Sequence, residues 1–332
     1  YPLNQLSTAE IDELQLLAPF GVGNPKPKFV IEQMQIESSK QIGQNKNHLK
    51  FVLEKNEVKL EAIGFRMGNH FNHIEPEAMV SVVGELSINE WNGFRKPQVL
   101  IDDLEVNHWQ LFDWRGKTDV NEKIKEIPKA QREIICFSEK AIKSLNLQPL
   151  DEDVRLYADA SSLDIEIEDE KPYVIFADLP ESIEDIETII KNRRTFPERV
   201  YLIFYPPEEE YFFTAFPTRE QFKWLYGFLI KQKRFEYKKM LTAIANHKGW
   251  QRELVEFIFA VFFELDFAKI EEDFVNLNTH PDKKPLTASS LYMKRQELAK
   301  VEELFNYSSR RELKNWFNQL SLDLKHTEEA MF

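Results

Sequence analysis

Hydrophobic and polar residues alternate with a two-residue period through the first third of the chain. Leu49, Phe51 and Leu53 are each separated by a residue that would face the other side of a strand. That period is typical of a strand with one buried face. The same pattern predicts five strands, over Phe29–Ile36, His48–Glu54, Val58–Phe65, Ala78–Ile88 and Gln98–Val106. Five strands with an irregular piece between the third and fourth fit an OB barrel, and Asn92-Gly93 predicts a tight hairpin between the last two.

Residues 107–217 change character, because short apolar runs there alternate with helical segments. Strands are predicted over 133–137, 154–158, 173–178 and 199–205, with helices reaching Leu145 and spanning 181–191. This succession predicts a small, mostly parallel sheet covered by helices.

After Pro217 the hydrophobic period becomes helical. An apolar stripe that includes Phe222 and Leu229 predicts one helix, a second follows around Leu241, and a third covers 250–264. Residues 267–277 then alternate like a hairpin, so the order predicts a winged-helix-like domain, and 291–320 adds two more helices. Capping boxes are predicted at the N-termini of three helices, beginning at Ser7, Thr218 and Ser309. The fold class is therefore multidomain α+β. We expect an N-terminal helix and hinge over 1–28, the OB-fold over 29–106, an α/β domain over 107–217 and the helical domain over 218–332.

Residues 17–29 form the hinge between the first helix and the barrel. The helix is predicted to run to Leu17 and cannot cross Pro19, because a proline inside a helix removes a backbone hydrogen bond. Two glycines then permit a sharp turn, and two later prolines hold the chain extended. We expect the flanking Phe20 and Phe29 to be buried, and Lys26 and Lys28 to lie in solvent.

The order of short motifs after the hinge is distinctive. It comprises Asn47-His48-Leu49-Lys50-Phe51, Ala62-Ile63-Gly64-Phe65, the run from Gly84 to Gly93, and the run from Pro97 to Leu104. This order closely resembles the C-terminal part of RecJ, the bacterial single-strand-specific 5′ to 3′ DNA exonuclease, in which such a segment forms an OB-fold. The resemblance is strong over residues 1–106. Beyond them it is similar to the extra C-terminal region that some Gram-positive RecJ proteins carry.

Length and composition agree with a multidomain globular protein. A chain of 332 residues is long enough for two or three domains, and it contains no apolar run near the roughly 18 residues that suggest a membrane helix. Its single cysteine, Cys136, lies in an apolar run and is expected in the core, so the cytoplasm is the expected compartment. Because the chain begins at Tyr1, we expect it to be a fragment of a longer protein.

The net charge of −13 is unevenly distributed. Residues 151–189 hold fourteen acidic residues against Arg155 and Lys171, a balance of −12. Residues 219–252 hold nine basic residues against Glu220 and Glu236, a balance of +7. A basic segment on an acidic protein indicates a local footprint for a polyanion or an acidic partner.

Candidate binding residues of the OB-fold follow from how such barrels bind single strands, through the loops between strands 1 and 2 and strands 4 and 5 and the face of strands 2 and 3. Loop 1–2 is predicted over Ser38–Asn47, and loop 4–5 is predicted to carry Trp91, Phe94, Arg95 and Lys96 beside the turn. Aromatic rings stack on bases of any sequence and cations follow phosphates. The alternative is that the aromatics close the barrel end and the cations form a solvated rim. The candidates are Lys46, His48, Lys50, Lys59, Trp91, Phe94, Arg95 and Lys96.

A second candidate surface lies in the helical domain. The helix 250–264 is apolar on nearly all sides and is not expected to read a groove. Binding there would use phosphate contacts, or would hold the acidic, apolar tail of a single-strand binding protein. The RecJ resemblance implies such a partner, and a RecQ-type helicase as another; a plain solvated face is the remaining alternative. The residues concerned are Lys238, Lys239, Lys248, Trp250 and Arg252.

The RecJ resemblance implies a Mn²⁺ or Mg²⁺ centre built on an Asp-His-His motif in a preceding domain, and this sequence has no such triplet. His70 and His73 are spaced like ligands, yet no further organisation accompanies them. Gly116-Lys117-Thr118 resembles half of a phosphate loop, but Leu111 replaces the required glycine and no strand is predicted before it. We therefore expect no catalytic or metal residues here.

The leading hypothesis is the non-catalytic C-terminal part of a RecJ-like, metal-dependent exonuclease of DNA repair and recombination. One alternative is a stand-alone replication or repair adaptor that binds single-stranded DNA or single-strand binding protein. Another is a motor-like enzyme whose middle domain binds nucleotide.

Overall fold

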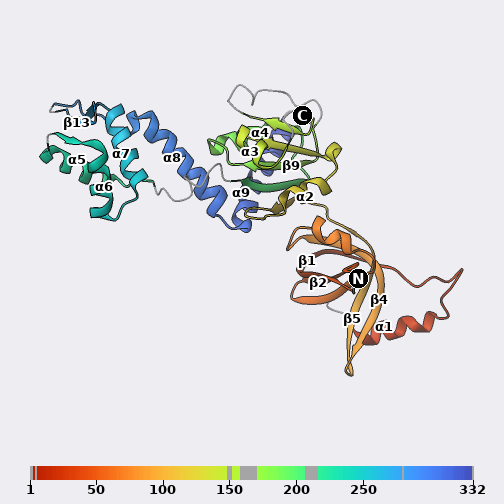
Figure 1. Cartoon of the computed structure of the whole chain (residues 1–332). Coiled ribbons are helices and arrows are strands. Elements are labelled where there is room, and N and C mark those ends of the chain that lie inside the picture. The colour runs from red at the N-terminus through yellow and green to blue at the C-terminus, as the bar shows by residue number, and fades with distance from the viewer. Residues whose placement is uncertain are drawn as a thin grey trace. The chain divides into compact units, whose positions relative to one another are not determined.

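The computed structural model describes residues 3, 6–147, 152–157, 170–205, 216–232, 234–278 and 280–330, with side chains up to residue 324. Much of the acidic stretch, Ala158 at the end of a predicted strand, and Lys233 of the basic segment lie outside the described residues. The chain forms two compact units, one of residues 1–112 with 197–200 and the other of 113–196 with 201–332 (Figure 1). No described helix is long and apolar enough to span a bilayer. The four predicted domain ranges stay predictions.

The first unit contains a closed five-stranded barrel with the strand order β1-β2-β3-β5-β4, which confirms the predicted OB-fold. Its interior holds the side chains of the predicted alternation, since Leu49, Phe51 and Leu53 are fully buried. A 3₁₀ helix, η3 (Gly68–His73), joins the third strand to the fourth. The strands are β1 (Phe29–Ile42), β2 (His48–Lys55), β3 (Val58–Gly64), β4 (Met79–Trp91) and β5 (Phe94–Glu105).

Three strand boundaries differ from the prediction in ways that matter for the candidate site. β1 continues through polar residues to Ile42, so loop 1–2 is residues 43–47 rather than Ser38–Asn47. β4 and β5 continue to a two-residue turn at Asn92-Gly93, where both residues have positive φ, 48° and 79°. The predicted hairpin is confirmed, but the residues predicted in loop 4–5 lie on its strands, which extend beyond the barrel (Figure 1).

The N-terminal segment forms α1 (Thr8–Leu14) and a 3₁₀ turn, η2 (Gln15–Leu17), before the hinge. The capping box of Ser7 and Glu10 is present as predicted. The side-chain amide of Asn24 donates to the carbonyls of Leu17 and Pro19, both at 2.9 Å, and so fixes the turn.

Two expectations about the hinge side chains are met only in part. Phe20 and Phe29 are half-buried rather than buried. Lys26 and Lys28 are exposed, but they pair with Glu85 at 3.5 Å and Asp102 at 3.2 Å.

The second sheet has the strand order β6-β10-β9-β7-β8, and β7 pairs in parallel with both β8 and β9. This confirms the predicted α/β domain. Cys136 is buried, and desolvation raises the pKa of its thiol to about 12, as expected of a core residue. The strands are β6 (Gln110–Asp113), β7 (Arg132–Cys136), β8 (Val154–Leu156), β9 (Tyr173–Asp178) and β10 (Arg199–Tyr205). The helical segments are α2 (Val120–Glu126), η4 (Lys129–Gln131), α3 (Glu139–Ser144) and α4 (Ile183–Lys191).

β6 was not predicted, and it corrects one step of the sequence argument. A strand does lead toward Gly116-Lys117-Thr118. Leu111, at the position where a phosphate loop requires glycine, is nevertheless fully buried within β6. A phosphate loop would therefore have to begin inside a strand, at a buried leucine where the loop needs glycine.

The rest of the second unit begins with a helix, a strand, two helices and a hairpin, which is a winged-helix-like arrangement. β11 was not predicted; it joins the hairpin in a sheet of order β11-β13-β12. α7 is buried on most sides, as expected, with Val255, Ile258 and Phe259 fully buried. The capping boxes at Thr218 and Ser309 are present. The elements are α5 (Arg219–Gln232), β11 (Arg234–Glu236), α6 (Tyr237–Lys248), α7 (Arg252–Glu264), β12 (Ala268–Glu271), β13 (Phe274–Leu277), η6 (Leu286–Ala288), α8 (Ser290–Glu302), the π-helical turn η7 (Glu303–Tyr307) and α9 (Arg310–Ala330).

Candidate nucleic-acid interface

The β4–β5 hairpin sorts its side chains by strand register. Trp91 pairs with Phe94 across the turn, and Asn89 pairs with Lys96 two positions further along each strand. Because successive side chains point to opposite faces of a strand, these four lie on one face of the hairpin. Arg95, one residue out of step, lies on the other face.

That face of the hairpin continues onto the outer surface of the barrel. Gln98 of β5 pairs with Glu61 of β3, and Glu61 accepts hydrogen bonds from Lys50 Nζ of β2 at 2.7 Å and from Asn89 Nδ2 at 3.4 Å. The Lys50 ammonium, and to a lesser degree Lys96, lower the pKa of the Glu61 carboxyl. We call the set Lys50, Glu61, Asn89, Trp91, Phe94 and Lys96 the barrel face.

The aromatic rings of the barrel face are open to solvent. Trp91 is 74% exposed and Phe94 is 73% exposed. The alternative that these side chains close the barrel end is therefore wrong, because a plug would be buried. Two large apolar side chains exposed side by side at a hairpin tip are available to a ligand with flat faces.

The predicted cations differ in whether an acidic side chain already pairs with them. Arg95 makes a two-pronged contact with the Asp12 carboxylate of α1, at 2.8 and 3.1 Å. Lys59 is paired with Glu37 and lies 4.0 Å from Glu54. Lys96 has no ion pair at contact distance in the part of the chain that the structure describes, so it is the cation of the hairpin that is most available to a phosphate.

Loop 1–2 is held in place by a glycine that the sequence argument did not single out. The Gly68 amide donates to the Asn47 carbonyl at 3.0 Å, and a Cβ on Gly68 would lie 2.2 Å from the Lys46 carbonyl oxygen. Only glycine allows this approach. Lys46 is thus presented at a fixed turn, with φ of 52°, and makes no ion pair among the described residues.

His48 is oriented by two neighbours beyond the end of β3. Its Nδ1 accepts a hydrogen bond from the Arg66 amide at 2.9 Å, and its ring meets Phe65 edge-on with centroids 5.2 Å apart. Phe65 is 57% exposed, which makes it a further aromatic near the predicted site. The available signal was its position directly after Gly64, the last residue of β3.

The five candidates of the helical domain do not form one open basic surface. Lys239 pairs with Glu236 at 2.6 Å, and Arg252 pairs with Glu256 at 2.8 Å. Lys238 has no ion pair among the residues that the structure describes. The other two candidates contact a residue that was not predicted, Trp224 of α5: the Lys248 ammonium lies 4.2 Å from the centre of its ring, and Trp250 meets it edge-on at 5.3 Å.

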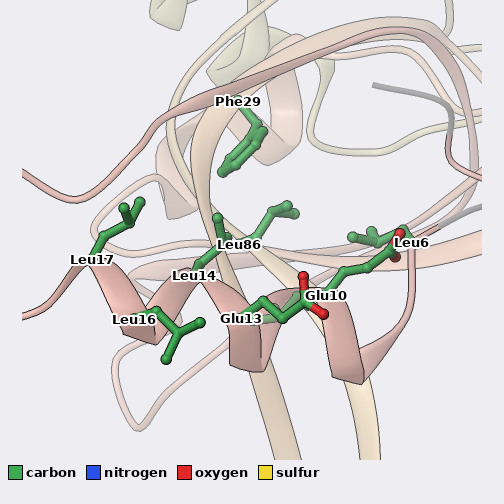
Figure 2. A pocket seen from close by; sticks show the side chains of 9 residues that line it. Leu6, Glu10, Glu13, Leu14, Leu16, Leu17, Phe29 and Leu86 are labelled. Atoms are coloured by element: carbon green, nitrogen blue, oxygen red, sulfur yellow. The ribbon is translucent and has the colours of Figure 1, made fainter.

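A separate apolar cavity of about 470 Å³ lies between α1 and the barrel. Figure 2 shows Leu14 of α1 and Leu17 of η2 on the side of Phe29 and Leu86 of the barrel, and Glu10 and Glu13 are the acidic groups of the lining. A lining of leucine and glutamate offers nothing to a phosphate, so this cavity is distinct in character from the barrel face.

The residues present do not fit the metal centre that the RecJ resemblance implies. Among the described residues, His, Cys, Asp and Glu form no group of three or more that could hold an ion. His70 and His73 lie on η3, and the nearby Glu75 is buried, where it accepts from the Leu111 amide at 2.8 Å and contacts His108 Nε2 at 3.3 Å.

Two protein-family models match the chain. Residues 110–317 match the C-terminal domain of single-strand DNA-specific exonuclease, and residues 1–103 match the RecJ OB domain. The single-stranded-DNA-specific exonuclease RecJ of Bacillus subtilis is 36% identical over 331 residues, which cover 99% of this chain and 41% of the relative. RecJ of Haemophilus influenzae is 36% identical over 102 residues, covering 30% of this chain and 17% of the relative. The chain spans less than half the length of either relative.

Solved structures show more distant likenesses. RecJ from Thermus thermophilus in complex with Mn²⁺ is 16% identical, covering 78% of this chain and 34% of its own, with a TM-score of 0.26. A second single-stranded DNA binding protein, from Mycobacterium smegmatis, is 15% identical, covering 24% and 84%, with a TM-score of 0.22. Scores this low carry no argument about binding, which must come from the residues of the barrel face.

Proposed function

Because this chain belongs to the RecJ family of single-stranded-DNA-specific exonucleases, we propose that its OB barrel holds single-stranded DNA on the barrel face, for a nuclease site that lies elsewhere in the full-length protein. The observation that carries this proposal is the exposed pair Trp91 and Phe94, presented beside Lys96 on one face of the hairpin. We propose that the protein acts in DNA repair and recombination in the cytoplasm.

The chemistry of the barrel face suits a ligand of any base sequence. A base of any type has a flat face that stacks on an aromatic ring, and the ammonium groups of Lys96 on this face and of Lys46 in loop 1–2 attract phosphates without reading bases. Affinity that comes from stacking and charge depends on strand length and salt rather than on sequence. That property suits a protein that must hold whatever strand is being degraded.

Binding of labelled oligonucleotides tests the proposal. We expect the chain to bind single-stranded oligonucleotides of mixed sequence and to bind duplex more weakly. The variant carrying Trp91→Ala, Phe94→Ala and Lys96→Ala should lose most of this affinity while its circular dichroism stays unchanged. Equal affinity of the wild type and the triple variant would overturn the proposal.

We propose that hydrolysis of the DNA strand takes place in another part of the family's longer proteins, where Mn²⁺ or Mg²⁺ would act. We expect the chain alone to leave labelled single strands intact in the presence of Mn²⁺, because clustered carboxylates and imidazoles are needed to hold catalytic metals. Processive product formation that is abolished by changing His70 or His73 would contradict this expectation.

A second role is partner binding by residues 219–252, with a single-strand binding protein or a RecQ-type helicase as partners. Its support is the cluster of Lys248, Trp224 and Trp250, which combines charge with apolar surface. The stand-alone adaptor keeps both roles without a nuclease, and the coding sequence upstream of Tyr1 distinguishes the two hypotheses.

A further inference from the structure

Glu61 is an acidic side chain in the middle of the barrel face, which otherwise suits a polyanion. Its Oε2 accepts hydrogen bonds from Lys50 and Asn89, as described above. Its Oε1 accepts none from the described residues, and the side chain is 31% exposed. The Asn89 side chain donates to Glu61 through Nδ2, so its Oδ1 is a second acceptor that none of the described donors occupies. The barrel face therefore holds two acceptor oxygens that a ligand can use.

These acceptors lie next to the exposed rings. Asn89 precedes Trp91 by two residues on the same face of the hairpin, a spacing of about 7 Å along a strand. Glu61 follows on the neighbouring strand of the barrel, within hydrogen-bond distance of Asn89. A single strand that follows the face inward from a base stacked on Trp91 therefore meets Asn89 and Glu61 with its next nucleotide.

An acceptor on the path of a nucleic acid restricts which part of the strand can face it. A phosphate oxygen is itself an acceptor with the same sign of charge as the Glu61 carboxylate, so the two groups repel. The edge of a base, in contrast, carries N–H donors. Lys96, which pairs with Asn89 across the hairpin, supplies a cation for the phosphate at this point. The base rather than the backbone is thus expected to face Glu61.

We propose that Glu61 and Asn89 favour a base with an exocyclic amino group, such as cytosine, over thymine at the nucleotide next to the one on Trp91. The cytosine amino group donates to a carboxylate, which is how glutamate recognises this base. Thymine places a carbonyl oxygen at the same position, where it would face the oxygens of Glu61 and Asn89. This inference rests on the proposed binding of single strands by the barrel face and adds a preference among bases to it.

The preference is compatible with binding of every sequence. Stacking on Trp91 and Phe94 and the phosphate contacts hold the strand whatever its bases are. A thymine tract therefore still binds, but it gains nothing from Glu61. The carboxylate changes the affinity by the contribution of one base contact.

Two oligonucleotides of equal length, oligodeoxycytidine and oligodeoxyuridine, test the preference on the full chain at neutral pH. Uracil has the carbonyl oxygen of thymine without its methyl group, so it matches cytosine in size. We expect the wild type to bind the cytidine strand about fivefold more tightly. Glu61→Gln should remove this difference, because an amide donates to the uracil carbonyl as readily as it accepts from the cytosine amino group.

Glu37→Gln is the matched control, since it also removes an ion-paired carboxylate from the barrel, and it should keep the preference. The readout is the ratio of two affinities, so a general gain from the Lys50 ammonium released in Glu61→Gln cancels. A third strand, of cytidine dimethylated on its amino nitrogen, keeps the ring but lacks the donor hydrogens. The wild type should bind it no more tightly than the uridine strand.

Four outcomes would overturn the inference. They are equal affinity of the wild type for the cytidine and uridine strands, a difference that survives in Glu61→Gln, an equal loss of the difference in Glu37→Gln, and undiminished binding of the dimethylated strand. If both strands bind equally and Trp91→Ala weakens both, the barrel face still holds DNA and the base preference alone is wrong. If the folded wild type binds neither strand, the proposed function fails as well.

Discussion

The barrel face and the cluster of Trp224, Phe228, Lys248 and Trp250 in the helical domain have similar compositions, each combining lysine with large aromatic side chains, yet they differ in how the rings are used. On the barrel face Trp91 and Phe94 are 74% and 73% exposed at the tip of a hairpin. In the helical domain Trp224 is surrounded by Phe228, Trp250 and Lys248. An open ring offers a stacking surface to a base, whereas an enclosed ring offers an apolar wall to a side chain. Exposure of the ring, more than local charge, distinguishes the two surfaces.

The largest expected effect comes from comparing one tryptophan substitution on each surface. Trp91→Ala should weaken binding of single-stranded oligonucleotide by about 1–3 kcal/mol, because a stacked base loses its platform. Trp250→Ala should leave that affinity within error. Titrations at one salt concentration, with circular dichroism to check folding, measure both variants.

Trp91→Phe is the conservative variant for this test, since it keeps a smaller stacking surface and should retain part of the affinity. A base stacked on Trp91 should also quench its fluorescence, and the difference between wild type and Trp91→Phe isolates that signal from the other tryptophans. If Trp250→Ala lowers oligonucleotide affinity as much as Trp91→Ala, the distinction between the two surfaces is wrong.

The second prediction compares two neighbouring cations of the hairpin. Lys96→Ala should reduce the slope of log affinity against log salt by about 0.7, because one phosphate contact and its released counterion are lost. Arg95→Ala should leave the slope nearly unchanged, because Arg95 is on the opposite face and is already paired with Asp12. Equal slopes for the two variants would show that the strand register does not decide which cation meets the DNA.

The sequence contained part of this distinction. Once Asn92-Gly93 is read as a two-residue turn, alternation alone places Trp91, Phe94 and Lys96 on one face and Arg95 on the other. The pairing of Arg95 with Asp12 was not accessible, because 83 residues separate them and only the packing of α1 on the barrel brings them together. Local signals predict which way a side chain points, but not which distant charge neutralises it.

The barrel strands were predictable from the sequence, but some of their ends were not. Alternation predicted each barrel strand, because one face of each is buried. It failed where β1 reaches Ile42 and where β4 and β5 leave the barrel, because both faces are exposed there and no period marks the strand. β11 was missed because three residues are too short to show a period.

The third prediction tests whether Lys50, which pairs with Glu61 in the free protein, can contact a phosphate when that ion pair is removed. Glu61→Gln should release the Lys50 ammonium from its 2.7 Å contact and make the salt slope steeper by about 0.7, if Lys50 then meets a phosphate. Glu37→Gln removes the nearer of the two acidic partners of Lys59 and leaves Glu54 in place, so it is the comparison variant on the same barrel and should change the slope less. An unchanged slope in Glu61→Gln would show that Lys50 lies outside the path of the strand.

The smallest expected effect comes from comparing two carboxylates, Glu61 in the barrel and Glu264 in the helical domain. The pKa of each is lowered, but by a different cause. In the barrel, the Lys50 ammonium lowers the pKa of Glu61. At the end of α7, hydrogen bonds from the Ser289 and Ser290 hydroxyls and from the amides of Ser290 and Leu291 lower the pKa of Glu264 from its ordinary 4.5 to about 2. Glu264 thereby caps the start of α8.

A lowered carboxyl pKa in the folded state means that the unfolded chain binds the proton more tightly. The stability that Glu264 contributes is therefore fully present above about pH 4.5 and is lost as the pH falls toward about 2. Glu264→Gln should lower the melting temperature slightly at neutral pH, and the difference from wild type should shrink across that acid range. It should also persist in high salt, because hydrogen bonds from neutral donors are not screened as the Lys50–Glu61 ion pair is. The measurement is a set of melting curves recorded between pH 2 and 7, at low and high salt, for wild type, Glu264→Gln and the wing variant Glu272→Gln as control. A melting-temperature difference between Glu264→Gln and wild type that grows on acidification would contradict the prediction.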